Sequence, residues 1–433
     1  MIGILRSALV VYLVAGVPVL YSLYQLAGAK NPILVYYPLA ITFGVLALLN
    51  MRSLLRRKTH VLFYALFGAL AVATWLVRYR HEDTSFYPQM VSLVVCFVWL
   101  STFISVYFAI RTPKQLAIAL DTLDIIGLLI TASVYLSFVG RIFFGFTFGE
   151  SVDQFGQQRA FGPLGDQVGF VIVLFALLAL TQGQWLRMAV HVGAIVLTGT
   201  RGAMISLAIG MLWVVWYVLF LRQRQVQRRR YRLIFAVLLA AAAFGGFLAS
   251  PFGATAADRL FSAEQRNATI SDRLGPMRLG LQVFSDNPIS GVGFLGFSRL
   301  ESAYDFERTT VVGANTWSTQ NQYVQTATDG GIFGLMLLVL LLWQIIRTLL
   351  LALHHPAPTA NRELFAFVAY VVAIAIGNQA AVWLLPSAAT GYFLLLIAGI
   401  GERTLLLKRQ LAPAPAEETP FFHGHRASSR VPW

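Results

Sequence analysis

Long apolar runs separated by short polar breaks fill almost the whole chain. Each run is about 15–24 residues long, close to the roughly 20 residues that a helix needs to cross a bilayer. They cover residues 4–27, 31–50, 61–77, 89–110, 116–139, 168–183, 185–199, 202–221, 233–249, 331–350, 364–385 and 387–401. The pattern predicts an all-α, polytopic membrane protein with about 12 transmembrane helices.

Two longer polar stretches interrupt this pattern, Gly140–Gln167 and Ser250–Ser318, and both carry arginines. From Pro276 to Ser285 the apolar residues Met277, Leu281 and Phe284 recur at helical spacing. The second stretch is therefore expected to be partly helical, beginning at Gly275-Pro276 and ending at Asp286-Asn287-Pro288. A helix that began there would place Arg273 just before its first turn, where exposed amides favour an anion.

Composition supports a membrane protein and limits the alternatives. The chain is 57% hydrophobic and only 12% charged, against about 25% charged in soluble proteins. A net charge of +14 raises nucleic acid as a partner. However, the densest basic run, Arg222–Arg232, directly follows an apolar segment, as a positive-inside anchor and a contact for membrane lipids would. The single cysteine, Cys96, excludes an internal disulfide and lies in an apolar run.

The distribution of charge predicts the orientation of the helices. With the N-terminus inside, about two thirds of the 33 lysines and arginines fall on the cytoplasmic side, and most acidic residues fall outside. Both termini are then cytoplasmic, and residues 411–433 form a disordered cytoplasmic tail. His191 is in mid-span, where a structural role is expected.

This topology leaves several arginines on the outer side, of which Arg201 is the most informative. It lies in Thr198-Gly199-Thr200-Arg201-Gly202, between two apolar runs with no room for a loop. An arginine at that depth either extends to the interface or holds an anion such as phosphate through its planar fork. Gly291–Gly296 matches G-x-G-x-x-G by letters, but no strand precedes it, so a turn is expected there instead of a dinucleotide site.

Three segments together resemble the core of the O-antigen ligase/polymerase superfamily, which includes the WaaL ligases and Wzy-type polymerases. They are TGTRGAMISL at Thr198–Leu207, RLGPMRLGLQVFSDNPISGVG at Arg273–Gly293, and NQYVQTATDGGIFG at Asn321–Gly334. The resemblance implies a bacterial inner-membrane glycosyltransferase that moves sugar chains from undecaprenyl diphosphate at the periplasmic face, without metal or cofactor. It implies one membrane domain over residues 1–410, with its core at 168–401 and periplasmic loops at 140–167 and 250–318.

The resemblance also suggests roles for particular residues. Family arginines fall on Arg201 and Arg273, and a less strict one falls on Arg159. The candidate catalytic residues are Arg201, Arg273, Gln320 and Asn321. The candidate ligands for the diphosphate and sugar are Arg159, Arg278 and Tyr323.

One departure favours a polymerase within the superfamily. The ligases carry a histidine just before the asparagine of the third segment, whereas this chain has Gln320, whose neutral amide can orient a hydroxyl but cannot take its proton. The general base is left open among five acidic residues: Asp166, Glu264, Asp272, Asp286 and Asp329.

Within the superfamily, the chain resembles the Wzy-type polymerases for O-antigen or exopolysaccharide. Their substrates are undecaprenyl-diphosphate-linked oligosaccharides, and a chain-length regulator and a flippase are implied partners. The alternatives are a ligase that transfers glycan to lipid A-core or protein, and a membrane transporter, which would favour ionisable residues at mid-membrane and broken helices.

Overall fold

The computed structural model describes residues 7–16, 18–19, 45, 102–144, 150–152, 158–160, 164, 168–220, 263–293, 297, 319, 321–355, 357, 360–377 and 389–411. The predicted spans 61–77 and 233–249 lie outside these residues, as does the span 31–50 apart from residue 45. Cys96, Gln320, the basic run Arg222–Arg232 and the tail after Leu411 also lie outside them.

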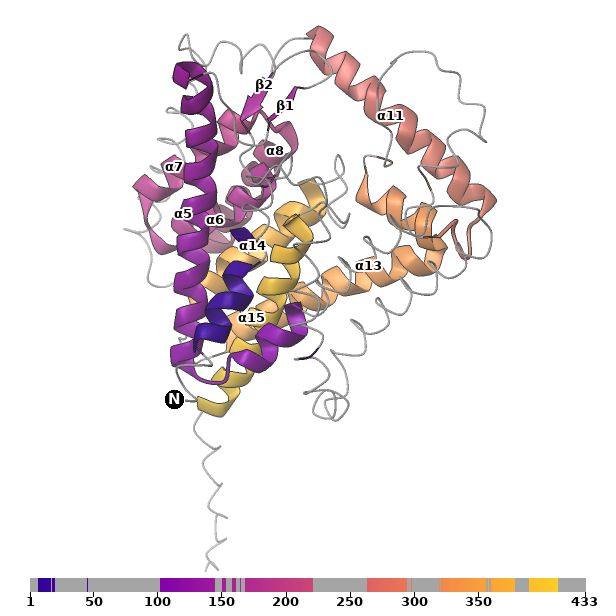
Figure 1. Ribbon diagram of the computed structural model, residues 1–433. Coiled ribbons are helices and arrows are strands. Elements are labelled where there is room, and N and C mark those ends of the chain that lie inside the picture. Colours follow the sequence, from indigo (N-terminus) through magenta and orange to yellow (C-terminus); the bar gives the residue numbers. More distant parts are fainter. Residues whose placement is uncertain are drawn as a thin grey trace, which may run out of the picture.

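The described chain is a helical bundle (Figure 1). Its helices are α5 (Pro113–Phe144), α6 (Val168–Gln182), α7 (Trp185–Thr198), α8 (Arg201–Phe220), α11 (Ala263–Asp286), α13 (Gln322–His354), α14 (Asn361–Gly377) and α15 (Ala389–Leu411). A helix at Ser7–Gly16 packs on α15, where the Tyr392 hydroxyl donates to the Leu13 carbonyl at 2.5 Å. The prediction of a helical protein is confirmed.

The all-α prediction missed one small feature. Strands β1 (Glu150–Val152) and β2 (Gln158–Ala160) pair antiparallel inside the first polar stretch, with Glu150 opposite Ala160. Both α5 and α7 contact β2. The ribbon therefore lies against the end of the bundle where α5 and α7 finish.

Helices α6, α14 and α15 form the centre of the bundle. Every residue of α6 from Val168 to Leu180 is buried, as is every residue of α14 from Leu364 to Val371. Such continuous apolar burial is the pattern of a helix enclosed by other helices. Helices α5, α7, α8 and α13 surround this centre.

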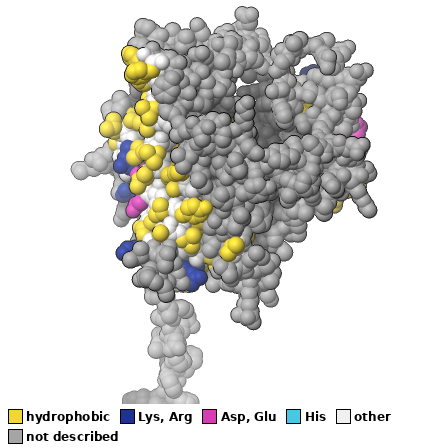
Figure 2. All heavy atoms as spheres, viewed as in Figure 1, with side chains coloured by type: hydrophobic (Ala, Val, Ile, Leu, Met, Phe, Trp, Pro, Cys, Tyr) yellow, Lys and Arg dark blue, Asp and Glu magenta, His cyan; other side chains and the backbone are white. Residues whose placement is uncertain are grey.

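The outer helices expose apolar stripes. On α5 the stripe is Ile125, Leu129, Leu136 and Phe143, each more than half exposed, at the spacing of one helix face. Hydrophobic side chains form a band along the side that α5 occupies (Figure 2). Among the described residues, three helices are long and apolar enough to cross a membrane, Pro113–Gly140, Gln322–His354 and Thr390–Leu411. The chain is a membrane protein, and its exposed stripes fit contact with lipid.

His191 is a buried polar residue with a hydrogen-bond partner inside the bundle. His191 of α7 lies 2.7 Å, through Nδ1, from the Thr131 hydroxyl of α5, and its ring is tilted against Phe175. The structural role predicted for His191 is confirmed.

Lys408 joins the ends of three helices. Its ammonium is fully buried and donates to the Ala352 carbonyl of α13, at 2.8 Å, and to the Asn361 side chain of α14. Removing one partner of a buried charge leaves that charge undersolvated. Asn361→Ala is therefore expected to lower stability by about 1–3 kcal/mol, measured as a lower midpoint of thermal unfolding in detergent. The double variant Asn361→Ala/Lys408→Met removes the charge as well and should melt above the single variant; an equal or lower midpoint would contradict this account.

Candidate functional site

A break divides α13 close to its N-terminus. Gly331 has φ 63° and ψ −159°, a backbone conformation that essentially only glycine adopts. The break separates a short segment, Gln322–Gly330, from the long apolar segment that follows. The predicted span 331–350 begins at this point, so the short segment is an addition that the apolar pattern did not include.

The turn that follows α11 fills the break. In a regular helix the carbonyl of residue 328 would accept from the amide of residue 332. Here the Thr328 and Asp329 carbonyls accept from the Val292 and Gly293 amides, each at 2.9 Å. The amide of Ile332 donates instead to the Pro288 carbonyl at 2.8 Å. The polar groups that the break releases are thus satisfied by protein, as membrane-embedded backbone requires.

Glycines permit this close contact. Gly291 has φ 64°, and a Cβ atom there would lie 2.5 Å from the carbonyl of Asp329. A Cβ atom on Gly331 would lie 2.1 Å from the carbonyl oxygen of Ile289. The turn predicted at this glycine motif is confirmed for residues 291–293, and its function is to dock into α13.

Helix α11 is locked to α13 by a further contact. The Thr328 hydroxyl shares its proton between the Gly280 carbonyl of α11, at 3.0 Å, and the Val324 carbonyl of its own helix, at 2.8 Å. A Cβ atom on Gly280 would lie 2.6 Å from Thr319 Cγ2. Together with the docked turn, this contact joins the second and third family-like segments into one unit. We call this unit, residues 277–293 with 319–332, the α11–α13 lock.

A polar network shapes the start of α13. Asn321 caps the helix: its side-chain oxygen accepts from the Tyr323 amide at 2.9 Å and the Val324 amide at 3.2 Å. The Thr319 amide donates to Gln325 Oε1 at 2.9 Å. Gln325 Nε2 donates in turn to both carboxylate oxygens of Asp329, each at 3.0 Å. The network holds the residues on either side of position 320.

The first family-like segment forms the turn between α7 and α8. Gly199 ends α7 with φ 61°, and the half-buried Arg201 is the first residue of α8. A Cβ atom on Gly169, at the start of α6, would lie 3.0 Å from the Thr198 hydroxyl. The turn is therefore packed directly on α6, which explains the small residues around Arg201.

Helix α14 connects this turn to the α11–α13 lock. The Tyr323 hydroxyl of α13 donates to the Ala375 carbonyl of α14 at 2.5 Å. Two residues later, a Cβ atom on Gly377 would lie 2.3 Å from the Ser206 hydroxyl of α8. Arg201 is little more than one turn before Ser206, so the structure brings the three segments to the same end of the bundle.

Two expectations about α11 were wrong, and one was right. The helix begins at Ala263, not at Gly275-Pro276, and Pro276 lies inside it. Arg273 is therefore an internal helix residue, and the argument that it precedes a first turn with free amides does not hold. Helix α11 ends at Asp286, as predicted.

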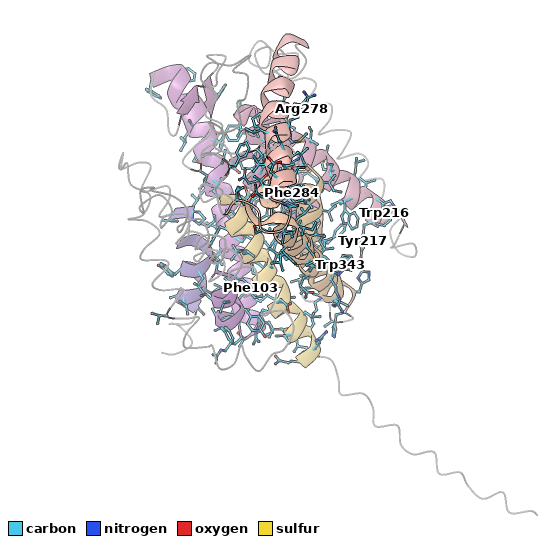
Figure 3. All side chains as sticks on the ribbon, turned by 90° about the vertical axis from the view of Figure 1, so that its right-hand side faces the viewer. Phe103, Trp216, Tyr217, Arg278, Phe284 and Trp343 are labelled. Carbon is cyan, nitrogen blue, oxygen red and sulfur yellow. The ribbon has the colours of Figure 1, made fainter. Side chains whose placement is uncertain are left out.

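Arg273 and Arg278 lie on one continuous helix, so their positions are about 140° apart around its axis. Arg278 is exposed on α11 (Figure 3). Arg159 lies in β2, opposite Ser151. Gln320 lies outside the described residues.

The structure separates some of the five acidic candidates. Asp329 is only 7% exposed and belongs to the polar network, whereas Asp286 is exposed at the end of α11. The side chains of Asp166, Glu264 and Asp272 lie outside what the structure describes. Among the described residues, no group of three or more His, Cys, Asp or Glu side chains is arranged to hold a metal ion.

Sequence reasoning missed several residues of the lock, including Gln325, Thr328, Gly280 and Gly331. Two patterns in the sequence point to these residues. Asn321, Gln325 and Asp329 follow each other at intervals of four, which places them on one helix face. The pair Gly330-Gly331 interrupts a helical pattern, and such a pair often marks a kink.

The end of the bundle away from Arg201 carries a cavity and several basic residues. The start of α5, the turn between α6 and α7, and the start of α14 surround a cavity of about 440 Å³. Arg187 forms an ion pair with Asp124 there. The charge distribution in the sequence puts Arg187, Lys114 and Arg362 on the cytoplasmic side. They lie at the starts of α7, α5 and α14, at the end of the bundle away from Arg201.

Comparison with known proteins agrees with this geometry. Residues 186–339 match the family model described as O-Antigen ligase. The match covers the α7–α8 turn and the whole α11–α13 lock. No curated protein matches the chain. The predicted resemblance is thereby confirmed: through residues 186–339, this membrane protein is similar to the O-antigen ligase/polymerase superfamily.

Proposed function

We propose that the protein is a polysaccharide polymerase of the inner membrane. The donor is a growing glycan on undecaprenyl diphosphate, and the acceptor is the non-reducing-end hydroxyl of a lipid-linked repeat unit. The hydroxyl oxygen attacks the anomeric carbon of the donor and forms the new glycosidic bond. The bond from that carbon to the diphosphate oxygen breaks, its electron pair leaves with the diphosphate, and the hydroxyl proton passes to a base.

One observation carries the proposal: three segments far apart in sequence lie at the same end of the bundle, linked through α14, and each brings an arginine or an amide. The diphosphate gains negative charge as its bond to the sugar breaks, and fixed cations stabilise that charge. We assign this role to Arg201 and Arg273, with Arg278 and Arg159 in support. Gln320 and Asn321 would orient the acceptor hydroxyl. The Tyr323 hydroxyl is engaged with Ala375, which leaves its ring for contact with a sugar.

The proposed site faces the periplasm, and both termini are cytoplasmic. The basic residues at the opposite end of the bundle support this orientation under the positive-inside rule. The domain limits predicted from sequence belong to the same proposal: a membrane domain over residues 1–410, periplasmic loops at 140–167 and 250–318, and a cytoplasmic tail at 411–433. Membrane lipids, a chain-length regulator and a flippase are the proposed partners.

A ligase keeps the same chemistry and changes the acceptor to lipid A-core or protein. Gln320 argues against it, because the amide cannot act as the base that a histidine supplies. A transporter finds some support in the broken helix α13, since transporters bind ions at unwound carbonyls. However, the Thr328 and Asp329 carbonyls at this break already accept hydrogen bonds from Val292 and Gly293.

Purified protein in liposomes should distinguish these functions. The substrate is the glycolipid that accumulates in cells lacking the gene, which for a polymerase is the single lipid-linked repeat unit. A polymerase is expected to turn it into a ladder of longer lipid-linked chains without any other protein. Transfer only to added lipid A-core would establish the ligase instead, and movement across the bilayer without elongation would establish the transporter.

A further inference from the structure

Asp329 is a buried carboxylate in the α11–α13 lock. It is 7% exposed, and burying a carboxylate is costly unless hydrogen bonds compensate. Its main-chain carbonyl binds the docked turn, and both of its side-chain oxygens accept from the same Gln325 amide group. The carboxylate is therefore directed at Gln325.

Gln325 passes this constraint to the start of α13. A side-chain amide can present either its oxygen or its nitrogen to a given neighbour. A carboxylate only accepts hydrogen bonds, so the side-chain nitrogen of Gln325 must face Asp329. The side-chain oxygen of Gln325 then faces the Thr319 amide, which is 2.9 Å away. The Thr319 hydroxyl donates in turn to the Asn321 carbonyl at 2.9 Å. Asp329 thus determines the position of Thr319 through Gln325.

Thr319 and Asn321 are both fixed, one by Gln325 and the other by its own cap on α13. We propose that Asp329 is a positioning residue for the acceptor: through Gln325 and Thr319 it holds Asn321, and thereby sets how the acceptor hydroxyl is oriented. This inference rests on the proposed function of Asn321. It assigns Asp329 a role other than the general base, because its carboxylate is already engaged with Gln325.

The test compares Asp329→Ala and Asp329→Asn in liposomes. Donor chains made by the wild-type protein are mixed with radiolabelled single repeat units as acceptor, and kcat and KM are measured for each substrate. Hydrogen bonds to charged groups are among the stronger ones, so Asp329→Ala is expected to reduce kcat/KM for the acceptor by about 10–100-fold. The donor KM should change by less than about twofold, because the acceptor alone depends on Asn321. Asp329→Asn keeps an oxygen for Gln325 and should retain most acceptor activity.

Three comparisons make the result decisive. Gln325→Ala should reproduce the acceptor defect, and the double variant should be no worse than either single variant, because both residues act along one path. The matched control is Thr326→Val: Thr326 is on the same helix but hydrogen bonds only with Gln322, so it should leave acceptor kinetics unchanged. Equal loss for donor and acceptor, an additive double variant, or an Asp329→Asn variant as inactive as Asp329→Ala would overturn the proposal. Inactive wild-type protein in the same assay would instead overturn the polymerase function itself.

Discussion

Arg201→Lys is expected to reduce the rate of chain elongation by on the order of 10²–10³. Lysine keeps the positive charge but loses the planar fork that binds two phosphate oxygens at once. Arg201 is held at the start of α8, in a turn packed on α6, so the cation is already in place before charge develops on the diphosphate. The measurement is the initial rate of polymer formation in liposomes at saturating donor. Arg273→Lys is expected to show a loss of similar size.

A control for this prediction lies at the other end of α7. Arg187→Lys is the same change, in an arginine that pairs with Asp124 roughly 20 Å away along that helix. Lysine can keep this partly buried ion pair, so the Arg187 variant should polymerise at nearly the wild-type rate. If Arg201→Lys and Arg187→Lys behave alike, or if Arg201→Lys gives polymer of normal length at normal protein levels, Arg201 does not act on the diphosphate.

The sequence predicted helices best where burial is continuous. The expected spans 168–183 and 185–199 differ from α6 and α7 by one residue at one end. The short turn between them carries Gly183, with φ 78°, which ends one apolar run before the next begins. Here the local pattern and the tertiary structure agree, because every residue of α6 from Val168 to Leu180 is buried.

The sequence predicted the end of α11 but not its start. A Gly-Pro pair normally marks the beginning of a helix, since proline lacks an amide hydrogen for the turn before it. In this protein the helix continues through Pro276, and Leu279 and Val283 on its inner side pack with Phe297.

In the candidate site, too, short motifs were predictive and contacts between distant segments were not. The motifs identified Arg201, Asn321 and the glycine turn, each of which lies at the end of the bundle that the three segments share. The Gly330-Gly331 pair signals a kink in α13, but the turn that docks there could not be predicted from it, because the groups that satisfy the break come from Pro288, Val292 and Gly293, about 40 residues earlier. The Gly330-Gly331 pair alone is equally consistent with close helix packing.

Gly331→Ala is expected to have the largest effect on the folded site. The new methyl group would meet the Ile289 carbonyl at 2.1 Å, and it would sit on a backbone with φ 63° and ψ −159°. The backbone strain alone costs about 1–3 kcal/mol, and the collision adds to it because main-chain atoms cannot rotate away. Relief requires the docked turn to leave α13, which would expose the carbonyls of Thr328 and Asp329. We expect a large drop in the midpoint of thermal unfolding and no polymer from the protein that remains.

Gly183→Ala separates the two causes of this effect. Gly183 also has positive φ, at 78°, but nothing lies within 4 Å of a Cβ atom there. Its variant should show the cost of backbone strain without a collision, about 1–2 kcal/mol, and should still polymerise. If Gly331→Ala were no more harmful than Gly183→Ala, the turn could move aside without loss, and the α11–α13 lock would not be what holds the site together. A loss of activity confined to Gly331→Ala would instead link the docked turn directly to the chemistry at the start of α13.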